Sequence, residues 1–287
     1  MTDIRELIDL LKMKGLSETV FLGQNYLSPW KRVFGGQVLA QALSAATQTV
    51  DPERAAHSLH AYFLLAGDIN VPIVYEVEKI RDGGSFSTRR VVAKQNGIAI
   101  FFLSASYQKR NQGGYDHSIE MPQVPGPEGL KSDEEIIRKF EKWIPNTISE
   151  LITSRPFEFR IVEGFDIFDN STKPPYKHVW FKAKQAVEAS PEIHQQLLTY
   201  VSDYNLLITA TLPHTEGPYP FDVFMASLDH AIWFHRDFTV NDWLLYAIDS
   251  PSASNSRGFT RGNIFTRDGT LVASVTQEGL IRPKTEK

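Results

Sequence analysis

The chain has 287 residues, of which 42% are hydrophobic and 22% are charged, and it carries a formal net charge of −4 and no cysteine. This composition is typical of a folded globular protein and leaves room for two domains of ordinary size. It argues against a nucleic-acid partner, which usually requires a basic surface, and it excludes disulfides, zinc–thiolate sites and cysteine nucleophiles.

The first residues of the chain carry charges where a signal peptide needs an apolar segment. No apolar run approaches the ~20 residues of a membrane-spanning helix. The final residues, Pro-Lys-Thr-Glu-Lys, are not a peroxisomal address. We therefore expect a cytoplasmic protein with no membrane insertion.

The first half of the chain is predicted to begin with two helices and a strand. Residues 4–13 have the pattern of a short amphipathic helix, and residues 21–26 that of a strand. Gly35 and Gly36 then introduce a helix predicted over 36–49, and glycine there allows close backbone approach or an unusual dihedral angle. Apolar and small residues cover most of this helix, which is typical of a buried one. It is either a central helix that a sheet wraps or an ordinary core helix beside a sheet.

Four strands are predicted after this helix, at residues 58–65, 73–80, 86–95 and 98–108. Alternating apolar and polar residues mark the second of them. The dipeptide Asn96-Gly97 joins the last two as a hairpin. Glycine and proline then cluster over residues 109–131, as in a linker. Ser132 and Glu135 have the spacing of a capping box, which predicts that a linker helix begins there.

The same pattern recurs in the second half. Strands are predicted at 157–165 and 178–186, a helix at 191–210, and further strands at 223–234, 243–248, 259–266 and 270–277. Two segments are similar between the halves, one around His60 and His230 and one ending at Gln108 and Gln277, at offsets of 170 and 169 residues. The sequence therefore predicts an α+β protein in which a unit of one helix and one antiparallel sheet is duplicated.

Asp203 is the residue of the helix predicted at 191–210 that could carry chemistry, because apolar residues surround it in the sequence. If this helix is buried, the carboxylate must find hydrogen-bond donors or take up a proton, and such groups gather at functional sites. The alternative, given equal weight on the residues alone, is an aspartate that lies on an exposed helix edge or caps a loop.

Motifs of several enzyme classes are absent. The sequence has no Gly-x-Ser-x-Gly elbow, no phosphate-binding loop, no dinucleotide fingerprint and no His-Glu-x-x-His motif. His57 and His60 would point to opposite faces of a strand, which is poor geometry for a metal. A structural or hydrogen-bonding role is favoured for them and for His230 and His235. Water activated by polar side chains fits the remaining residues better than a covalent mechanism.

Five motifs carry a resemblance to a known family. They are Val-Phe-Gly-Gly-Gln-Val at 33–38, His-Ser-Leu-His-Ala-Tyr-Phe at 57–63, Asp-His-Ala-Ile-Trp-Phe-His at 229–235, Arg-Gly-Phe at 257–259 and Thr-Gln-Glu-Gly at 276–279. Together they resemble acyl-CoA thioesterase II, the TesB-type family, essentially from end to end. The resemblance implies a double hotdog fold, with two tandem units in which an antiparallel sheet wraps around a long central helix. We expect an N-terminal hotdog at 1–110, a linker with a helix at 111–155, and a C-terminal hotdog at 156–287 that carries the catalytic residues.

The resemblance also implies a reaction and a site. The reaction is hydrolysis of fatty acyl-CoA to free fatty acid and CoA, without metal or cofactor. The family's catalytic trio falls on Asp203, Ser227 and Gln277, and serine stands where close relatives often have threonine. Asp203 is expected to act as a general base on water that the other two residues hold. The first half is expected to lack such a trio, since Gln108 has no aspartate partner.

Other contacts with the substrate are less sharply predicted. His57 is a candidate substrate-binding residue, and the candidates for the CoA phosphates are Arg89, Arg90, Arg257 and Arg261. A non-catalytic acyl-CoA-binding or sensing module on the same fold is the alternative function, and loss of a trio residue would favour it. An enoyl-CoA hydratase would require a paired aspartate and histidine at the start of the helix, which is not seen. By analogy with related folds we expect a homo-oligomer, a dimer or a tetramer.

Overall fold

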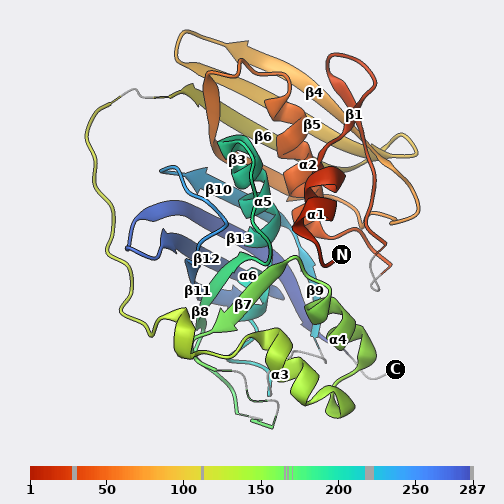
Figure 1. Ribbon diagram of the computed structural model, residues 1–287. Coiled ribbons are helices and arrows are strands. Elements are labelled where there is room, and N and C mark those ends of the chain that lie inside the picture. The colour runs from red at the N-terminus through yellow and green to blue at the C-terminus, as the bar shows by residue number, and fades with distance from the viewer. Residues whose placement is uncertain are drawn as a thin grey trace.

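The computed structural model describes residues 1–27, 31–110, 113–164, 166, 168–169, 171–216 and 223–284. The first half of the chain lies at the top of Figure 1. Its elements are α1 (Ile4–Leu11), β1 (Lys14–Gly15), β2 (Val20–Gly23), α2 (Gly35–Thr47), β3 (Arg54–Phe63), β4 (Ile73–Asp82), β5 (Phe86–Gln95) and β6 (Ile98–Lys109).

A long connection follows and leads into the second half, below it in Figure 1. The connection contains η1 (Pro127–Gly129), α3 (Asp133–Lys139), η2 (Glu141–Trp143) and α4 (Asn146–Thr153). The second half contains β7 (Phe157–Ile161), β8 (Tyr176–Ala183), α5 (Pro191–Ser202), α6 (Leu206–Thr209), β9 (Val223–Ser227), β10 (Asp229–Phe234), β11 (Leu244–Ser254), β12 (Arg257–Thr266) and β13 (Leu271–Pro283).

All thirteen strands that the described residues form belong to one antiparallel sheet. Its order is β1-β2-β4-β5-β6-β3-β10-β13-β12-β11-β8-β7, and β9 pairs with β13 beside this path. The two halves meet where β3 pairs with β10, so that Leu59 lies opposite Ile232 and His60 opposite Ala231. The predicted double hotdog is confirmed, and its two sheets are continuous through this strand pair.

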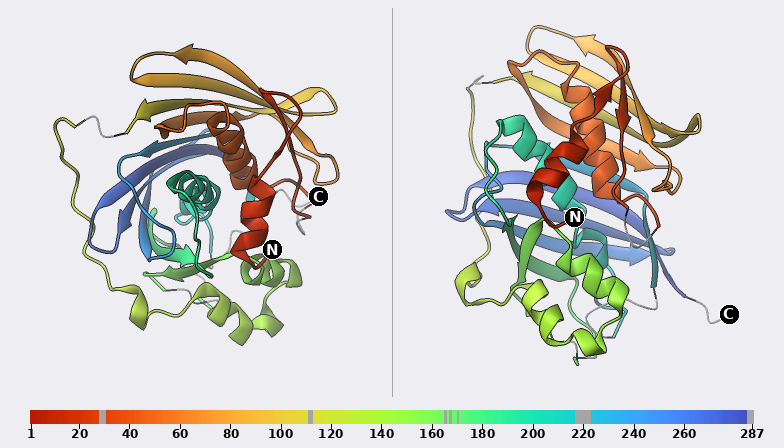
Figure 2. Two further views of the ribbon diagram at one scale, coloured as in Figure 1. Left: turned by 45° about the horizontal axis from the view of Figure 1, so that its top comes forward. Right: turned by 45° about the vertical axis from the view of Figure 1, so that its right-hand side comes forward.

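Each half curves its strands around one helix, α2 in the first half and α5 in the second. Figure 2 (left) looks along α5 and shows the strands of the second half around it. Every residue of α2 from 36 to 46 is buried, as expected for a helix that is apolar nearly all round. The two helices pack closely, because a Cβ atom on Gly36 would lie under 3.0 Å from the carbonyl oxygen of Tyr200 in α5. The prediction of a central helix is therefore confirmed.

The helix predicted over 191–210 is interrupted. α5 ends at Ser202 and Asp203 is its C-cap. α6 begins only after Asn205, whose φ of 65° lies in the left-handed region that asparagine tolerates better than most residues. The prediction of one continuous helix was wrong because the apolar residues that follow Asn205 extend the helical pattern without showing the break. As a result, Asp203 lies at the end of a buried helix.

The strand predicted over 223–234 is also divided. β9 ends at Ser227 and pairs with β13, whereas β10 begins two residues later and pairs with both β13 and β3. Leu228 lies between them, and both its backbone N–H and its carbonyl oxygen still form hydrogen bonds. Its N–H donates to the carbonyl oxygen of Glu278, and its carbonyl oxygen accepts from the N–H of Phe63, both at 2.9 Å. The break leaves Ser227 at the end of a strand, where its side chain reaches the neighbouring strand β13.

The similarity that ends at Gln108 and Gln277 does not mark equivalent positions. Gln277 is buried on the face of the sheet that packs against α5. Gln108 follows Tyr107, whose hydroxyl lies 3.1 Å from Thr47 of α2. Successive strand residues point to opposite faces, so Gln108 points away from α2. The inward face of β6 near this point is mainly apolar, with Leu103 and Ala105 buried there.

The linker is attached mainly to the second half of the protein. The predicted capping box is confirmed at the start of α3. The Ser132 hydroxyl accepts the backbone N–H of Glu135, and the Glu135 carboxylate accepts the backbone N–H of Ser132. Glu134 of this helix forms an ion pair of 2.6 Å with Lys184. The indole N–H of Trp180 donates to the carbonyl oxygen of Pro125 at 2.9 Å. The linker therefore covers one side of the second sheet.

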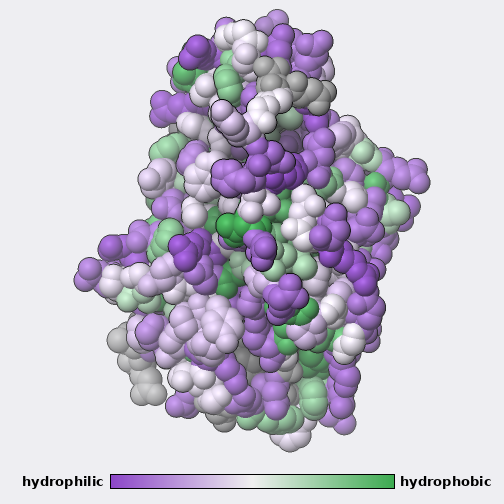
Figure 3. All heavy atoms as spheres, turned by 90° about the vertical axis from the view of Figure 1, so that its left-hand side faces the viewer, coloured by the Kyte–Doolittle hydropathy of each residue, from purple (hydrophilic) through white to green (hydrophobic). Residues whose placement is uncertain are grey.

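The surface is largely polar on the face shown in Figure 3, where hydrophobic residues appear in small separate groups. Among the described residues, no helix combines the length and the apolar character needed to cross a membrane.

Candidate active site

Asp203, Ser227 and Gln277 lie together in the structure. The side-chain amide of Gln277 donates to Asp203 Oδ1 at 3.2 Å and to Ser227 Oγ at 2.6 Å. The other carboxylate oxygen, Asp203 Oδ2, accepts the backbone N–H of Gly36 at 2.9 Å. Three elements of the second half and the first turn of α2 thus meet at one carboxylate.

The ends of α5 and β9 lie beside the middle of β13, which brings these side chains together. Asp203 follows the last turn of α5, and Ser227 is the last residue of β9. Gln277 lies in the middle of β13, fully buried, with its side chain toward α5. As the C-cap of α5, Asp203 keeps right-handed helical dihedral angles, so its side chain continues the direction of the last turn. Ser227 is still paired with Gly279 of β13, two residues past Gln277.

Gly35 and Gly36 allow the first half to reach the carboxylate. A Cβ atom on Gly35 would lie 2.7 Å from Asp203 Oδ2, and one on Gly36 would overlap the Tyr200 backbone. Neither glycine has a positive φ, so of the two predicted reasons for this pair, close backbone approach is the one that the structure supports. The N-terminus of α2 also presents partial positive charge to the carboxylate.

The surroundings of Asp203 make its carboxylate a stronger base than usual. The residue is partly exposed, but burial of the carboxylate is the main effect and raises its pKa to about 6. The hydrogen bonds from Gln277 and Gly36 favour the charged form and offset only part of this rise. The aromatic rings of Phe34 and Tyr204, whose centroids are 4.6 Å apart, help to keep this region apolar. A carboxylate with a pKa near 6 is suited to accept a proton at neutral pH.

The sequence indicated a hydrogen-bonding role for His230 but did not connect it with the site. His230 is fully buried, and its Nδ1 lies 3.3 Å from Gln277 Oε1. The backbone N–H of Gly36 was also missed as a partner of Asp203. The signal for both was their place inside two of the five motifs that carry the resemblance, at 33–38 and 229–235.

His57 lies away from the trio. Its Nε2 is 2.9 Å from the hydroxyl of Ser106, on a strand where the neighbouring Tyr107 faces α2. Ser106 and His57 therefore lie on the outer face of the sheet, where the His57 ring also packs edge-on against Phe86. This position does not support the prediction of His57 as a substrate-binding residue.

Arg89 is a structural residue rather than a surface cation. Its side chain is 2% exposed, and its guanidinium makes five hydrogen bonds within the protein. Two of them go to Thr49, just past the C-terminal end of α2, and one to Asp82 at 2.7 Å. All five guanidinium N–H groups are then used. The prediction that Arg89 binds the CoA phosphates is not supported, because no donor is left for a ligand.

Replacing Arg89 with lysine is expected to destabilise the protein by about 2–4 kcal/mol, because one ammonium cannot reproduce five fixed hydrogen bonds in a buried site. Arg89→Lys should lower the melting temperature clearly, while the KM for acyl-CoA stays within about twofold. Arg90→Lys is the matched control for stability, since Arg90 is exposed and its guanidinium lies over the Phe102 ring, 5.9 Å from the centroid. A raised KM with unchanged stability in Arg89→Lys would instead indicate a substrate contact.

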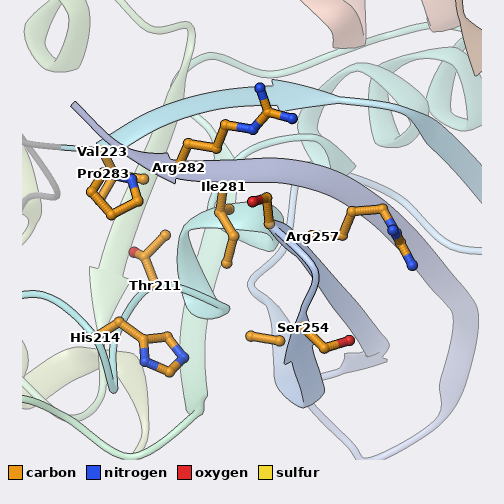
Figure 4. A pocket seen from close by; sticks show the side chains of 10 residues that line it. Thr211, His214, Val223, Ser254, Arg257, Ile281, Arg282 and Pro283 are labelled. Atoms are coloured by element: carbon orange, nitrogen blue, oxygen red, sulfur yellow. The ribbon is translucent and has the colours of Figure 1, made fainter. Parts of the chain in front are cut away.

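Arg257 is partly exposed and pairs with Leu280 of β13, three residues past Gln277. Its side chain is 43% exposed and its Nε donates to Glu278 Oε1 at 2.9 Å. It borders a cavity of about 350 Å³ between the α6 region and the ends of β12 and β13. Figure 4 shows the Arg257 and Arg282 side chains extending away from this cavity. Arg257 therefore remains a candidate contact for an anionic group at the surface.

The sequence matches two family models that together span both halves. The acyl-CoA thioesterase model matches residues 151–280, and the acyl-CoA thioesterase N-terminal domain model matches residues 26–108. Acyl-CoA thioesterase 2 of Haemophilus influenzae is 40% identical over 284 residues, which cover 98% of this chain and 99% of that protein. Acyl-coenzyme A thioesterase 8 of Mus musculus is 38% identical, with 99% and 92% covered.

Solved structures give the same result. The acyl-CoA thioesterase II TesB2 from Mycobacterium marinum is 37% identical and superposes with a TM-score of 0.79 over 97% of this chain and 99% of that one. A tesB protein from Mycobacterium avium subsp. paratuberculosis is 28% identical, with a TM-score of 0.80 over 98% and 100%. Because sequence and fold agree over nearly the whole length, the chain belongs to the TesB-type acyl-CoA thioesterase II family.

Proposed function

We propose that this protein hydrolyses the thioester of fatty acyl-CoA to free fatty acid and CoA, and that Asp203, Ser227 and Gln277 are the catalytic residues. The observation that carries the proposal is a buried carboxylate with a pKa near 6, held by Gln277 and by the N-terminus of a helix. Family membership supports the reaction, and no trio residue is missing from the sequence. A non-catalytic acyl-CoA-binding module would not need such a base.

The proposed reaction uses water as the nucleophile. Water bound between Asp203 and Ser227 gives a proton to the carboxylate as its oxygen attacks the thioester carbon. The developing oxyanion lies near the N-terminus of α2, where the helix dipole favours negative charge. The carbon–sulfur bond then breaks, and the protonated Asp203 returns its proton to the CoA thiolate. Gln277 holds the carboxylate and the Ser227 hydroxyl in place throughout.

The pH dependence of hydrolysis tests the proposed base. Asp203 is active when ionised, so kcat/KM should rise with pH through about 6 and level off above it. An aspartate of ordinary pKa would give a rise near pH 4 instead. The measurement is thiol release from acyl-CoAs of increasing chain length at pH 4.5 to 8.5. The protein has no cysteine, so a thiol reagent reports only the CoA set free.

Two outcomes of this experiment would contradict the proposal. Binding of acyl-CoA without release of thiol would favour the sensing module. Hydrolysis with no inflection between pH 5 and 7 would keep the reaction but remove Asp203 as the group that controls it.

We further propose that each predicted domain has a different role. The hotdog at 1–110 supplies the helix N-terminus, the linker at 111–155 supports the second sheet, and the hotdog at 156–287 supplies the catalytic side chains. Arg257 is proposed to contact a CoA phosphate at the surface. A cytoplasmic location, a role in fatty acid metabolism and assembly into a dimer or tetramer are also proposed, the last from the family resemblance.

A further inference from the structure

His230 is the one histidine among the described residues that is fully buried, and it lies directly behind the trio. Its strand β10 pairs with β13 so that Ala231 lies opposite Thr276, which puts His230 next to Gln277. His230 Nδ1 lies 3.3 Å from Gln277 Oε1, and His230 Nε2 lies 3.0 Å from the hydroxyl of Ser202, the last residue of α5. The imidazole thus connects the end of the helix that carries Asp203 with the amide that holds it.

The hydrogen bonds of Gln277 determine which way its amide must lie. Both N–H groups are used, one toward Asp203 and one toward Ser227. The amide oxygen therefore faces His230 and can only accept. If the amide were reversed, its oxygen would face the Asp203 carboxylate, and two acceptors would oppose each other.

The protonation of His230 follows from these contacts. Burial lowers the pKa of His230 to about 4, so the ring is neutral at neutral pH and carries one proton. Only the tautomer with the proton on Nδ1 can donate to Gln277 Oε1. The Ser202 hydroxyl has a single proton, which it can give either to Nε2 or to the carbonyl oxygen of Thr199 at 2.9 Å, so it fits both tautomers. The contact with Gln277 therefore decides the tautomer, because an unprotonated Nδ1 would oppose the amide oxygen.

We propose that His230 is a positioning residue: as the neutral Nδ1–H tautomer, it fixes the Gln277 amide so that its N–H groups face Asp203 and Ser227. It touches neither substrate nor water in the proposed reaction and acts only through Gln277. The inference rests on the proposed function, because the orientation matters for catalysis only if Asp203 is the base.

The charged and titratable groups around Asp203 allow a clean test by pH. Tyr204 beside it and Tyr246 of β11 both have pKa values raised by burial and stay neutral below pH 9. The guanidinium of Arg155 packs on the Tyr204 ring, 5.4 Å from its centroid. Lys177, which donates to Asn205 Oδ1 at 3.3 Å, has its pKa lowered by burial to about 8, and burial raises the pKa of Asp229. With a pKa of about 6, Asp203 titrates below Lys177 and these tyrosines.

The experiment compares His230→Leu with His230→Asn. Leucine removes both ring nitrogens, whereas the asparagine amide can place an N–H near the former Nδ1. His230→Leu should lower kcat about 10- to 100-fold, as expected for one misaligned hydrogen bond to a charged group, with KM little changed. It should also move the acidic limb of kcat/KM to higher pH, because the Asp203 carboxylate loses a donor that favours its charged form. In His230→Asn most of kcat should be retained, and the acidic limb of kcat/KM should lie close to its wild-type pH.

The matched control is His194→Asn. His194 is a buried histidine of α5 whose Nδ1 accepts the backbone N–H of Val240 at 3.3 Å, with no contact to the trio. The variant His194→Asn should leave both kcat and the acidic limb of kcat/KM unchanged. Equal losses in His230→Leu and His230→Asn, or a loss of kcat with an unmoved limb, would overturn the proposal and leave His230 a purely structural residue.

A second measurement does not depend on activity. In protein labelled with ¹⁵N-histidine, the NMR signals missing from His230→Asn identify His230, and they should show a neutral ring protonated on Nδ1 at pH 7. A ring protonated on Nε2 would overturn the proposal even if the enzyme is active. Absence of thiol release by the wild type would contradict the proposed function alone, since the tautomer is measured independently.

Discussion

Replacing Asp203 with asparagine is expected to lower kcat for acyl-CoA hydrolysis about 10²- to 10⁴-fold, the range that a positioned general base contributes. KM should change little, because asparagine has the same shape. One amide oxygen can still accept from Gly36 or from Gln277, the two donors that now meet the carboxylate. Thiol release at pH 8 from the best acyl-CoA substrate measures the loss.

Asp229→Asn is the control for this substitution. The pKa of Asp229 is also raised by burial, and its Oδ1 accepts the N–H of Glu278 at 2.7 Å. It precedes His230 in β10 and so points to the opposite face of the sheet. The kcat of Asp229→Asn should stay within a few-fold of the wild-type value. If Asp203→Asn also stayed within a few-fold, Asp203 would not be the base.

The substitution Asp203→Asn, which lowers activity, is expected to raise the free energy of unfolding at neutral pH. A carboxyl group whose pKa is higher in the folded than in the unfolded state binds more protons when folded, so its ionisation destabilises the fold above the folded pKa. For Asp203 this cost is about 2–3 kcal/mol above pH 6 and disappears near pH 4. Asp203→Asn should therefore raise the melting temperature at pH 8 more than at pH 5. A lowered melting temperature at both would show that the substitution disturbs folding.

Much of this site could be predicted from the sequence because its residues lie in short motifs. The family resemblance placed Asp203, Ser227 and Gln277, and the structure brings all three within hydrogen-bond reach. The glycine pair at 35 and 36 indicated a close backbone approach, but not what is approached. That partner lies 167 residues away in the chain, and nothing local in the sequence encodes it.

The errors have a common cause. Helical and strand periods describe the residues within an element, but not where a partner elsewhere interrupts it. The apolar residues after Asn205 extend the helical pattern, although Asn205 has a left-handed conformation. Arg89 has the residue type of a surface cation, but its position near the end of α2 buries it. Gln108 and Gln277 are the same residue type in similar segments. Their positions in the two strands differ by one residue, however, so the Gln108 side chain points to the other face of the sheet.

The substitution Gly36→Ala tests how the first half reaches the site, and it is expected to damage stability and activity together. A Cβ atom there would overlap the carbonyl oxygen of Tyr200 and the ring of Phe34. Alanine favours a helix over glycine by about 1 kcal/mol, whereas forcing extra atoms into a packed contact costs about 1–3 kcal/mol or more. The overlap is with backbone, which cannot rotate away, so the steric cost should prevail by about 2 kcal/mol.

The separation of α2 from α5 that relieves this overlap also lengthens the bond from the Gly36 N–H to Asp203. We therefore expect Gly36→Ala to lower the melting temperature by about 4–8 °C and kcat by about tenfold or more. Gly84→Ala is the matched control, because Gly84 is exposed between β4 and β5 and a Cβ atom there meets nothing within 4 Å. It should leave both quantities unchanged. If Gly36→Ala were as stable and active as Gly84→Ala, the close approach of the two helices would not be what holds the Asp203 carboxylate.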